Sequence, residues 1–299
     1  MKSGFVALIG RPNAGKSTLL NRLVGQKLAI VSDKPQTTRN RIIGVRNYDD
    51  AQVVFVDTPG VHRPLHRLNV RMLDAALATL KEVDVVTAVV DATDKPGGGD
   101  RFLMDVLRNV EPPRVLALNK VDLLPKERLL PLIERYSKDV DFADIVPVSA
   151  LKGDNVDRLE AVLRSHLPEG EPLYPEDFLT DQPERFFVAE MVREQVLQHT
   201  RAELPFASAV VVDRFEEPET PGGMLRFHCT ILVERESQKP IVVGKSGSMI
   251  KAIGTAARKE LEQFFDAKVF LDLRVKVRED WRENERVLDE LGLPRKRRH

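Results

Sequence analysis

The sequence has one cysteine among its 299 residues, and its 46 basic and 46 acidic side chains leave no net charge. Cys229 alone excludes an internal disulfide and an all-cysteine zinc site, which favours a protein of the reducing cytoplasm. No apolar run approaches the roughly 18 residues of a membrane-spanning helix, and residues 1–4 lack the zones of a signal peptide. The neutral total excludes a globally polycationic protein but is compatible with a local surface that binds nucleic acid.

Two domains are expected from this length and from an ordinary globular composition of 42% apolar and 31% charged residues. Up to about residue 167, short apolar runs alternate with amphipathic stretches, which predicts an α/β domain, a mostly parallel sheet with helices on both faces. The expected strands lie at 5–9, 53–56, 83–90, 115–118 and 145–148, and the expected helices near 16–24, 69–80, 100–110, 126–138 and 154–166. Sheets of this kind bind ligands at the carboxyl ends of their strands.

A linker is expected where this alternation stops, because three prolines and a glycine within 168–175 cannot continue a helix or a central strand. The second half has an α+β pattern, with helices at 184–202, 248–264 and 280–291 and strands at 207–216, 225–235, 241–243 and 268–277. We therefore divide the chain into a first domain at 1–170, a linker at 171–183 and a second domain at 184–299.

Charge is unevenly distributed in the second half of the chain. Residues 171–219 hold 4 basic and 12 acidic side chains, whereas residues 239–278 hold 9 basic and 4 acidic ones. We interpret the acidic stretch as a solvated face and the basic stretch as the place where a polyanion would bind.

A phosphate-binding loop is predicted between the first strand and the first helix. The residues Gly10, Arg11, Pro12, Asn13, Ala14, Gly15, Lys16 and Ser17 have the spacing G-x-x-x-x-G-K-[ST], and we include Thr18 in the site. Glycines let backbone N–H groups surround a phosphate, Lys16 brings charge to the β and γ phosphates, and Ser17 offers a hydroxyl to Mg²⁺. The alternative interpretation is a structural Gly-rich turn.

Guanine specificity is predicted by two later loops. Asn119-Lys120-Val121-Asp122 follows an apolar strand, and Asp122 can accept both N1–H and the 2-amino group of guanine, a pair of donors that adenine lacks. This tetrapeptide resembles the guanine-specificity motif of the translation-factor class of GTPases. Ser149-Ala150 resembles the matching loop whose backbone contacts the guanine O6. Without this context, an NKxD tetrapeptide is an ordinary solvated loop.

A Mg²⁺ site is predicted from Asp57-Thr58-Pro59-Gly60, which ends the second apolar run. In P-loop enzymes an Asp at this place holds Mg²⁺, and the glycine N–H reaches the γ-phosphate. The polar segment 31–41 has no periodicity, as expected of a mobile switch loop, and one of its threonines would complete the Mg²⁺ shell. We predict Thr38, with Thr37 as the alternative, so that Ser17, Thr38 and Asp57 hold the metal.

The usual catalytic glutamine is absent. Val61 follows Gly60 at the place where the Ras-like pattern has a glutamine that orients water, so hydrolysis is expected to be slow without another source of transition-state stabilisation. In GTPases that this chain resembles, an Asn at the place of Asn13 helps to bind K⁺ beside the phosphates. The predicted catalytic set is therefore Lys16, Thr38, Gly60 and Asn13, and the predicted cofactors are GTP or GDP, Mg²⁺ and K⁺. Alternatively, Asn13 only shapes the loop.

A second functional loop is predicted at Gly244-Lys245-Ser246-Gly247, a G-x-x-G between the strand expected at 241–243 and a helix. Such glycines permit a sharp turn close to a sugar-phosphate backbone, while Lys245 and Lys251 pair with phosphate. We expect a site for single-stranded RNA that also uses Ile241 and Ile250, although apolar residues at helical spacing are equally typical of a core.

Several further segments complete a family pattern. Together with the motifs above, Lys34-Pro-Gln-Thr-Thr-Arg39, Ala202-Glu-Leu-Pro205 and Ile231-Leu-Val-Glu-Arg235 resemble the Era family of GTPases, and the resemblance extends to about Leu293. It implies an α/β P-loop GTPase domain followed by an α+β type II KH domain. It also implies binding near the 3′ end of 16S ribosomal RNA, assistance in assembly of the small (30S) ribosomal subunit and, in some members, peripheral association with the inner membrane. The basic tail at 294–299 does not match the family pattern.

We therefore expect a cytoplasmic, monomeric, GTP-hydrolysing switch that binds ribosomal RNA through a KH domain. One alternative is a non-enzymatic RNA-binding assembly factor that holds guanine nucleotide as a stabilising ligand. Another is a GTPase of tRNA modification or of membrane and cell-division control, against which the G-x-x-G loop at 244–247 argues.

Overall fold

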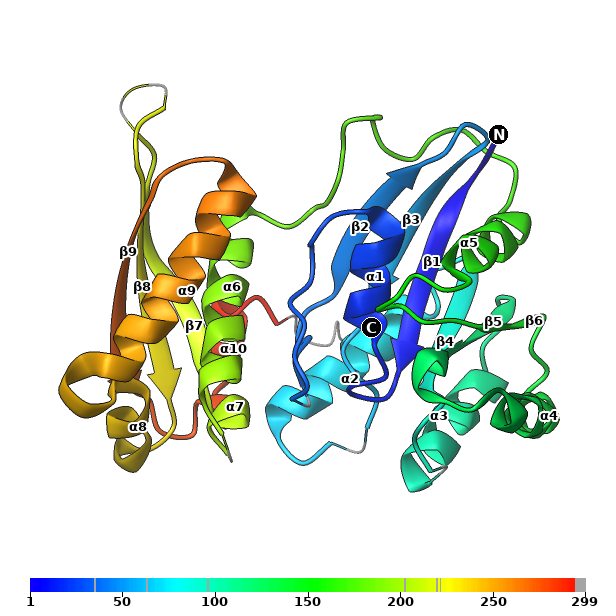
Figure 1. Ribbon diagram of the computed structural model, residues 1–299, viewed down its shortest axis with the longest axis horizontal. Coiled ribbons are helices and arrows are strands. Elements are labelled where there is room, and N and C mark those ends of the chain that lie inside the picture. Colours follow the sequence, from blue (N-terminus) through cyan, green and yellow to red (C-terminus); the bar gives the residue numbers. More distant parts are fainter. Residues whose placement is uncertain are drawn as a thin grey trace.

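The computed structural model describes residues 1–34, 36–62, 64–95, 97–201, 203–218, 220 and 222–293. The basic tail at 294–299 lies outside these residues, as do Pro35 and Ala202 of the family motifs. The described chain forms two bodies side by side, each with its own sheet and helices (Figure 1). Within the described ranges, no helix combines the length and apolar character that crossing a bilayer requires.

The first body is built on a six-stranded sheet in the order β2-β3-β1-β4-β5-β6, in which only β2 runs antiparallel to its neighbour. The strands are β1 (Lys2–Gly10), β2 (Ile42–Asn47), β3 (Ala51–Asp57), β4 (Val85–Asp91), β5 (Arg114–Asn119) and β6 (Asp144–Pro147). The predicted mostly parallel sheet is confirmed. β2 is an edge strand that the apolar pattern did not predict. The helix at Lys16–Val24 packs so closely on it that a β-carbon at Gly44 would lie 2.7 Å from a Val24 methyl.

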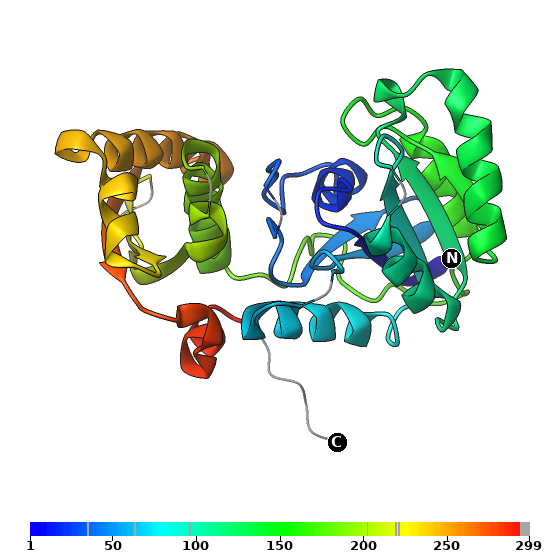
Figure 2. The same ribbon diagram turned by 90° about the horizontal axis from the view of Figure 1, so that it is seen from below.

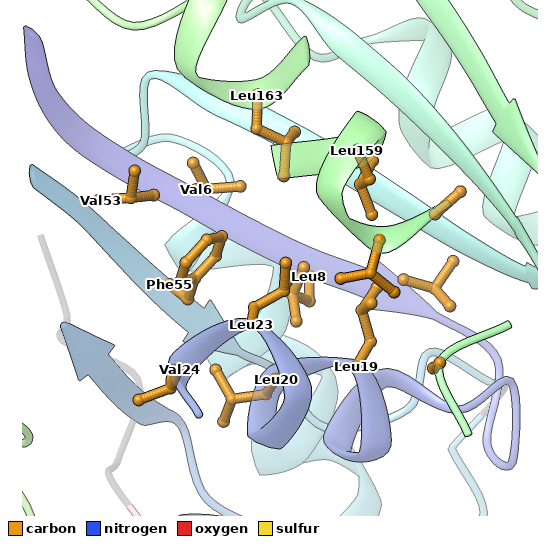
Figure 3. Close-up of a cluster of buried hydrophobic side chains, with 14 of the residues drawn as sticks. Val6, Leu8, Leu19, Leu20, Leu23, Val24, Val53, Phe55, Leu159 and Leu163 are labelled. Carbon is orange, nitrogen blue, oxygen red and sulfur yellow. The ribbon is translucent and has the colours of Figure 1, made fainter. Parts of the chain in front are cut away.

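Helices cover both faces of this sheet. α1 (Lys16–Val24) and α5 (Val156–Ser165) pack on one face, and α2 (Arg67–Thr79), α3 (Gly98–Arg108) and α4 (Leu129–Asp139) pack on the other. Figure 3 shows the first of these cores, where Leu20 and Leu23 of α1 meet Phe55 of β3 with no more than 1% of each side chain exposed. Burying a leucine or phenylalanine stabilises a fold by about 1.5–3 kcal/mol, so this core fixes the place of α1 firmly.

One edge of the sheet collects the chemically important loops. Because β1, β3, β4 and β5 are parallel, their carboxyl ends meet there, at Gly10, Asp57, Asp91 and Asn119. The loop after β1 is short, and α1 begins directly after Gly15, whose φ of 93° lies in the left-handed region that glycine tolerates. The amino end of α1 therefore lies at this edge.

The second body has a three-stranded sheet in the order β7-β8-β9. β7 (Ala209–Glu216) is antiparallel to β8 (Leu225–Val233), and β8 is parallel to β9 (Val269–Val277). The long helices α6 (Glu184–His199) and α9 (Ser248–Phe265) lie together on one face of this sheet (Figure 2). Shorter helices are α7 (Leu204–Ala207), α8 (Lys239–Val243) and α10 (Glu285–Glu290). The predicted α+β character is confirmed.

The strand expected at 241–243 is wrong, because these residues belong to helix α8. The run Ile-Val-Val has a high β-propensity, but Pro240 lies in the first turn of the helix and Gly244 ends it with a φ of 75°. These start and stop signals prevail over the propensity of three residues.

The two bodies touch through two sets of residues, which meet where the Arg39 guanidinium group lies 5.4 Å from the centre of the Trp281 ring. In what we term the loop contact, α6 and the backbone at 205–208 hold residues 27–39 of the first body. In what we term the helix contact, α2 packs against residues 281–293. Glu194 of α6 is only 3% exposed in the loop contact, where Lys27 pairs with it, so the interpretation of 171–219 as a solvated face is wrong at this helix.

The helix contact combines an apolar core with ion pairs at its rim. Its core contains Leu68 and Met72 of α2 together with Ala209, Leu232, Trp281, Val287, Leu288 and Leu293. Trp281 is fully buried, and its indole N–H donates to the Ala207 carbonyl at 2.9 Å. At the rim, Arg71 pairs with Glu285 and, at 2.9 Å, with Asp289.

A candidate nucleotide site and a candidate RNA interface

A cavity of about 490 Å³ opens at the carboxyl edge of the first sheet. It brings together three of the predicted loops, which are far apart in the sequence: the phosphate-binding loop, the 119–122 loop and the 149–150 loop. The predicted residues that line it are Pro12, Asn13, Gly15, Lys16, Ser17, Thr18, Thr38, Gly60, Asn119, Lys120, Asp122, Ser149 and Ala150.

Lys16 lies buried at the base of this cavity. Its ammonium group donates to the carbonyls of Gly10 at 3.2 Å and Arg11 at 3.0 Å. Burial lowers the pKa of Lys16 to about 8, against the opposing effect of the negative charge of Asp57. A buried ammonium group that faces backbone carbonyls is well placed to gain from an anionic ligand, and the amino end of α1 adds further N–H donors.

Three oxygen-bearing side chains converge beside Lys16. The Ser17 hydroxyl lies 2.6 Å from that of Thr38 and donates to Asp57 Oδ2 at 2.7 Å, and Thr38 Oγ1 is 3.4 Å from the same carboxylate oxygen. Asp57 is fully buried, and its other oxygen, Oδ1, has no hydrogen-bond partner among the described residues. Burial raises the pKa of this carboxyl, and the charge of Lys16 opposes that shift. Hydroxyls and an incompletely satisfied carboxylate are the ligands that Mg²⁺ prefers.

The two threonines of the 31–41 segment have different surroundings. Thr38 reaches Ser17 and Asp57, whereas the Thr37 hydroxyl donates to the Lys34 carbonyl at 2.6 Å, within its own loop. The geometry therefore favours Thr38 as the metal ligand.

Asn119 links the loops on the opposite side of the cavity. Its amide donates to the Ala14 carbonyl at 2.8 Å, and its Oδ1 accepts from the Ala150 N–H at 2.9 Å. A β-carbon at Gly15 would lie 2.2 Å from the Asn119 amide nitrogen, so a glycine is required at this position. Lys120 pairs with Asp91 at 2.5 Å. Asp122, two residues later, also lines the cavity.

Several predicted residues do not line the cavity and have supporting positions instead. These are Gly10, Arg11, Ala14, Asp57, Thr58 and Pro59. The Arg11 side chain turns away to Asp100 at 3.1 Å and Asp94 at 3.4 Å. The Thr58 hydroxyl donates to the Leu8 carbonyl at 2.8 Å and fastens the loop after β3 to β1.

Some lining residues were missed by the sequence-based prediction. They are Ile30, Val31, Ser32, Asp33, Gln36, Leu123 and Leu151, whereas Thr37, which also lines the cavity, was predicted as the alternative metal ligand. Leu123 and Leu151 are apolar yet 67% and 68% exposed, and each directly follows one of the two guanine-type motifs. That adjacency is a signal that could have identified them as walls for a flat ring.

Asn13 and Val61 define the surroundings of the phosphate end. The Asn13 amide donates to the Asp33 carbonyl at 2.7 Å, which ties the phosphate-binding loop to the 31–41 segment. Val61 is fully buried in the core, so its side chain does not reach the cavity. A β-carbon at Gly60 would lie 2.8 Å from the Pro12 nitrogen, so the loop after β3 needs a glycine to approach the phosphate-binding loop.

The G-x-x-G loop lies at the amino end of α9. Gly244, Ser246 and Gly247 all have positive φ, at 75°, 52° and 78°. A β-carbon at Gly244 would lie 2.6 Å from the Met249 nitrogen, whereas nothing lies within 4 Å of one at Gly247. Gly244 therefore serves the tight turn, and Gly247 leaves the backbone open to a ligand.

The neighbouring side chains provide charge and apolar surface. Lys245 and Lys251 are exposed, Ile241 is 50% exposed on α8, and Ile250 is partly buried on α9. In contrast, Ile253 is fully buried and belongs to the core. Exposed cations beside an open backbone at a helix amino end form a surface suited to a single strand of RNA.

Comparison with known proteins agrees with these features. Residues 5–120 match a family model described as a 50S ribosome-binding GTPase, and residues 203–282 match the KH domain. GTPase Era from Geobacter metallireducens is 52% identical over 291 residues, which make up 97% of each chain.

Solved structures match over nearly the whole chain. An Era variant from Aquifex aeolicus bound to GDP·AlF4⁻ is 41% identical, with a TM-score of 0.93 over 98% of this chain and 99% of that one. The structure of Era in complex with MgGDPNP and nucleotides 1506–1542 of 16S ribosomal RNA is also 41% identical, with the same coverage and a TM-score of 0.94.

A phosphate-binding loop, an NKxD loop and a KH domain on one chain define a GTPase with an attached KH domain. Identity of about half over nearly the full length goes further: the chain belongs to the Era family of GTPases. The family resemblance and the fold class predicted from the sequence are thereby confirmed.

Proposed function

We propose that this protein is a GTP-hydrolysing switch that binds 16S ribosomal RNA near its 3′ end and assists assembly of the small ribosomal subunit. One observation carries the proposal: the Era structure that contains both MgGDPNP and nucleotides 1506–1542 of 16S ribosomal RNA matches 98% of this chain. The match includes both the nucleotide cavity and the KH domain.

The nucleotide roles are assigned from the cavity geometry. Backbone groups of the loop 10–15 and the Lys16 ammonium bind the phosphates of GTP or GDP, with Thr18 beside them. On the base side, Asp122 accepts from guanine, with Asn119 and Lys120 supporting the loop and the 149–150 backbone facing the ring edge. Ser17, Thr38 and Asp57 hold Mg²⁺, which neutralises charge on the β and γ phosphates.

Hydrolysis has to proceed without a glutamine that orients the attacking water, because Val61 stands at that position. Because Val61 is buried, the groups assigned to the γ-phosphate end are Lys16, Thr38, the Gly60 N–H and Asn13. The Asn13 amide and the Asp33 carbonyl are the oxygen-bearing groups that would hold K⁺. We expect hydrolysis to be several-fold faster in K⁺ than in Na⁺ at equal ionic strength, and Asn13→Ala to abolish the difference. Equal rates in the two salts would remove K⁺ from the proposal.

The RNA roles are assigned to the G-x-x-G loop. Gly244, Ser246 and Gly247 set a backbone turn that RNA can approach, Lys245 and Lys251 pair with phosphates, and the apolar surface of Ile241 and Ile250 contacts bases. We expect Lys245→Glu to weaken binding of a 16S 3′-end oligonucleotide at least about 10-fold, because it reverses a phosphate contact. Lys268→Glu makes the same charge change at an exposed site beyond the other end of α9 and is the matched control.

The choice of subunit rests on the breadth of the match. The family model described as 50S ribosome-binding matches only residues 5–120, whereas the Era complex with 16S ribosomal RNA matches both bodies. Crosslinking in cells with recovery of the bound RNA tests this choice. Recovery of 23S ribosomal RNA or of tRNA instead would favour the alternative functions, including tRNA modification.

Enzymatic turnover separates the proposed switch from a factor that merely holds nucleotide. We expect multiple-turnover phosphate release to fall at least about 100-fold in Lys16→Ala, because removal of a charge at the reacting phosphate costs this much in other enzymes. Lys126→Ala, an exposed lysine of the same body, is the control. Release that survives in Lys16→Ala would point to a contaminating activity and to a nucleotide-stabilised RNA binder.

The proposal places the protein in the cytoplasm as a monomer. A peripheral inner-membrane fraction stays a prediction from the family resemblance. Cell fractionation with salt washes tests it, because electrostatic attachment to a membrane surface is released by salt.

A further inference from the structure

Arg193 of helix α6, in the second body, reaches into the first body. It is 2% exposed, and its guanidinium group donates to the backbone carbonyl of Thr37. Glu190, one turn earlier on α6, holds the same guanidinium group in a two-pronged contact at 2.7 and 2.6 Å. α6 therefore sets the position of the guanidinium group, and two hydrogen bonds to Glu190 leave this group little freedom to turn.

Thr38 is held from both sides by the second body. Arg193 donates to the carbonyl of Thr37, the residue before Thr38. The residue after it, Arg39, is 5% exposed and donates to the Ser208 carbonyl at 2.8 Å and the Pro205 carbonyl at 3.3 Å. Thr37 is held at its backbone carbonyl and Arg39 through its guanidinium group, so Thr38 between them has fewer conformations open to it. The Thr38 hydroxyl consequently lies within hydrogen-bonding distance of Ser17 and Asp57.

This arrangement is costly as a device for stability alone. The charge of Arg193 lies close enough to act unfavourably on Arg39, and in the described part of the chain Arg39 has no ion pair, only a contact of its guanidinium group with the Trp281 ring at 5.4 Å. Arg39 Nε and Arg193 Nη1 are buried without a hydrogen-bond partner among the described residues. Burying charges with unsatisfied donors costs free energy that the attraction to one carboxylate, Glu190, repays only in part. The contact therefore points to a geometric requirement.

We propose that Arg193 is a positioning residue of the nucleotide site, supplied in cis by the second body, which sets the place of the Mg²⁺ ligand Thr38. The inference rests on the proposed role of Thr38 and adds the residue that positions it. Since the switch threonine contacts Mg²⁺ only in the triphosphate state, Arg193 supports binding of a GTP analogue and not of GDP. The RNA-binding body thus contributes to the choice between the two nucleotide states.

The test measures nucleotide affinity by equilibrium titration of the full chain with fluorescent GDPNP and GDP at fixed Mg²⁺. We expect Arg193→Met to weaken GDPNP binding at least about 10-fold, the usual effect of removing a hydrogen bond from a charged donor, and to change GDP binding less than about 2-fold. Arg185→Met removes an exposed arginine from the same helix and should change neither affinity. Equal weakening of GDPNP and GDP binding would mean a general structural role and would overturn the inference.

A double-mutant cycle separates the inference from the function on which it rests. Thr38→Ala alone should weaken GDPNP binding selectively. The double variant with Arg193→Met should bind GDPNP no more weakly than Thr38→Ala, because both changes remove the same contact of Thr38 with Mg²⁺. If Thr38→Ala has no selective effect, the assigned role of Thr38 fails. If Thr38→Ala is selective but the two effects add, only the role of Arg193 fails. Arg193→Lys, which keeps the buried charge, should restore part of the GDPNP affinity and covers the case in which Arg193→Met does not fold.

Discussion

The loop contact and the helix contact join the same two bodies by different chemistry. In the loop contact, charged groups meet backbone: Arg193 binds the Thr37 carbonyl, Arg39 binds the Ser208 carbonyl, and Glu194 accepts from the Val31 N–H at 2.8 Å. In the helix contact, Leu68 and Met72 pack into an apolar cluster around Trp281. The polar contact faces the segment that carries Thr38, and the apolar contact faces α2.

The two contacts therefore differ in how strongly they respond to a small displacement of their partners. Apolar packing is non-directional and persists when its partners shift slightly, so the apolar core of the helix contact tolerates small displacements of the bodies. Hydrogen bonds to backbone carbonyls depend steeply on distance and angle, so the loop contact responds to a small displacement of residues 31–39. The segment next to the nucleotide is therefore bound by the interaction that is more sensitive to geometry.

The largest expected effect is on the apolar side. Trp281→Ala should lower the free energy of unfolding of the second body by about 3–5 kcal/mol, because it removes a fully buried indole and its hydrogen bond to Ala207. Denaturant unfolding followed by circular dichroism measures this change, since Trp281 is the only tryptophan of the chain. Trp281→Phe should lower the free energy of unfolding clearly less than Trp281→Ala. A loss below about 1 kcal/mol for alanine would show that residues 281–293 do not complete this core.

An intermediate effect is expected at Glu194. Glu194→Ala removes the acceptor of the Val31 N–H and the buried partner of Lys27, which together are worth about 1–3 kcal/mol. Hydrogen exchange of the Val31 amide should become faster, while exchange in α2 should stay unchanged. Accelerated exchange in both places would mean that the two contacts open together and that the contrast between them is wrong.

The same residue gives the loop contact a pH dependence. Burial raises the pKa of Glu194 above its ordinary value of 4.5, although Lys27 opposes the shift. Burial also lowers the pKa of Lys27, but Glu194 and Glu260 raise it overall; the shift at Glu194 decides, because its side chain is 4% exposed and that of Lys27 is 41% exposed.

A carboxyl whose pKa is raised by folding binds its proton more tightly in the folded state. The stability that it contributes is present below pH 4.5 and is lost as pH rises through the raised value. From pH 4 to pH 7, the unfolding free energy of the wild type should therefore fall relative to that of Glu194→Gln. Parallel curves for the two proteins would contradict the assigned direction.

The smallest expected effect is at Glu260. Its carboxylate accepts from Lys27 at 3.1 Å and remains 29% exposed, so solvent screens the pair. Glu260→Ala should change the unfolding free energy by about 0.2–1 kcal/mol, and 1 M NaCl should remove most of that difference. A larger loss, insensitive to salt, would place Glu260 among the residues that carry the loop contact.

The sequence predicted the nucleotide site better than it predicted the joining of the two bodies. Motifs such as 10–17 and 119–122 are local, and the parallel sheet brings them together whenever its strands form. The edge strand β2 was missed because its burial comes from α1 and from its hairpin with β3, neither of which a six-residue window contains. α8 was misread because its β-branched residues outweighed the signals at Pro240 and Gly244.

The contacts between the bodies have no comparable local signal. Arg193 lies 156 residues from Thr37, and nothing in its own neighbourhood distinguishes it from the exposed Arg185. The acidic stretch 171–219 reads as solvated because its partners, such as Lys27, are far away in the sequence. Which charges of this stretch are buried depends on how the two folded bodies meet, and that is a property of the tertiary structure.

Residues 281–293 also determine when the two bodies can join. They follow every other described element in the sequence, and the ribosome makes a chain from its amino end, with domains folding as units in that order. The first body can therefore fold while Leu68 and Met72 of α2 are still uncovered, and they remain so until this last segment has been made. During its own synthesis the protein thus exposes an apolar patch that the folded molecule covers.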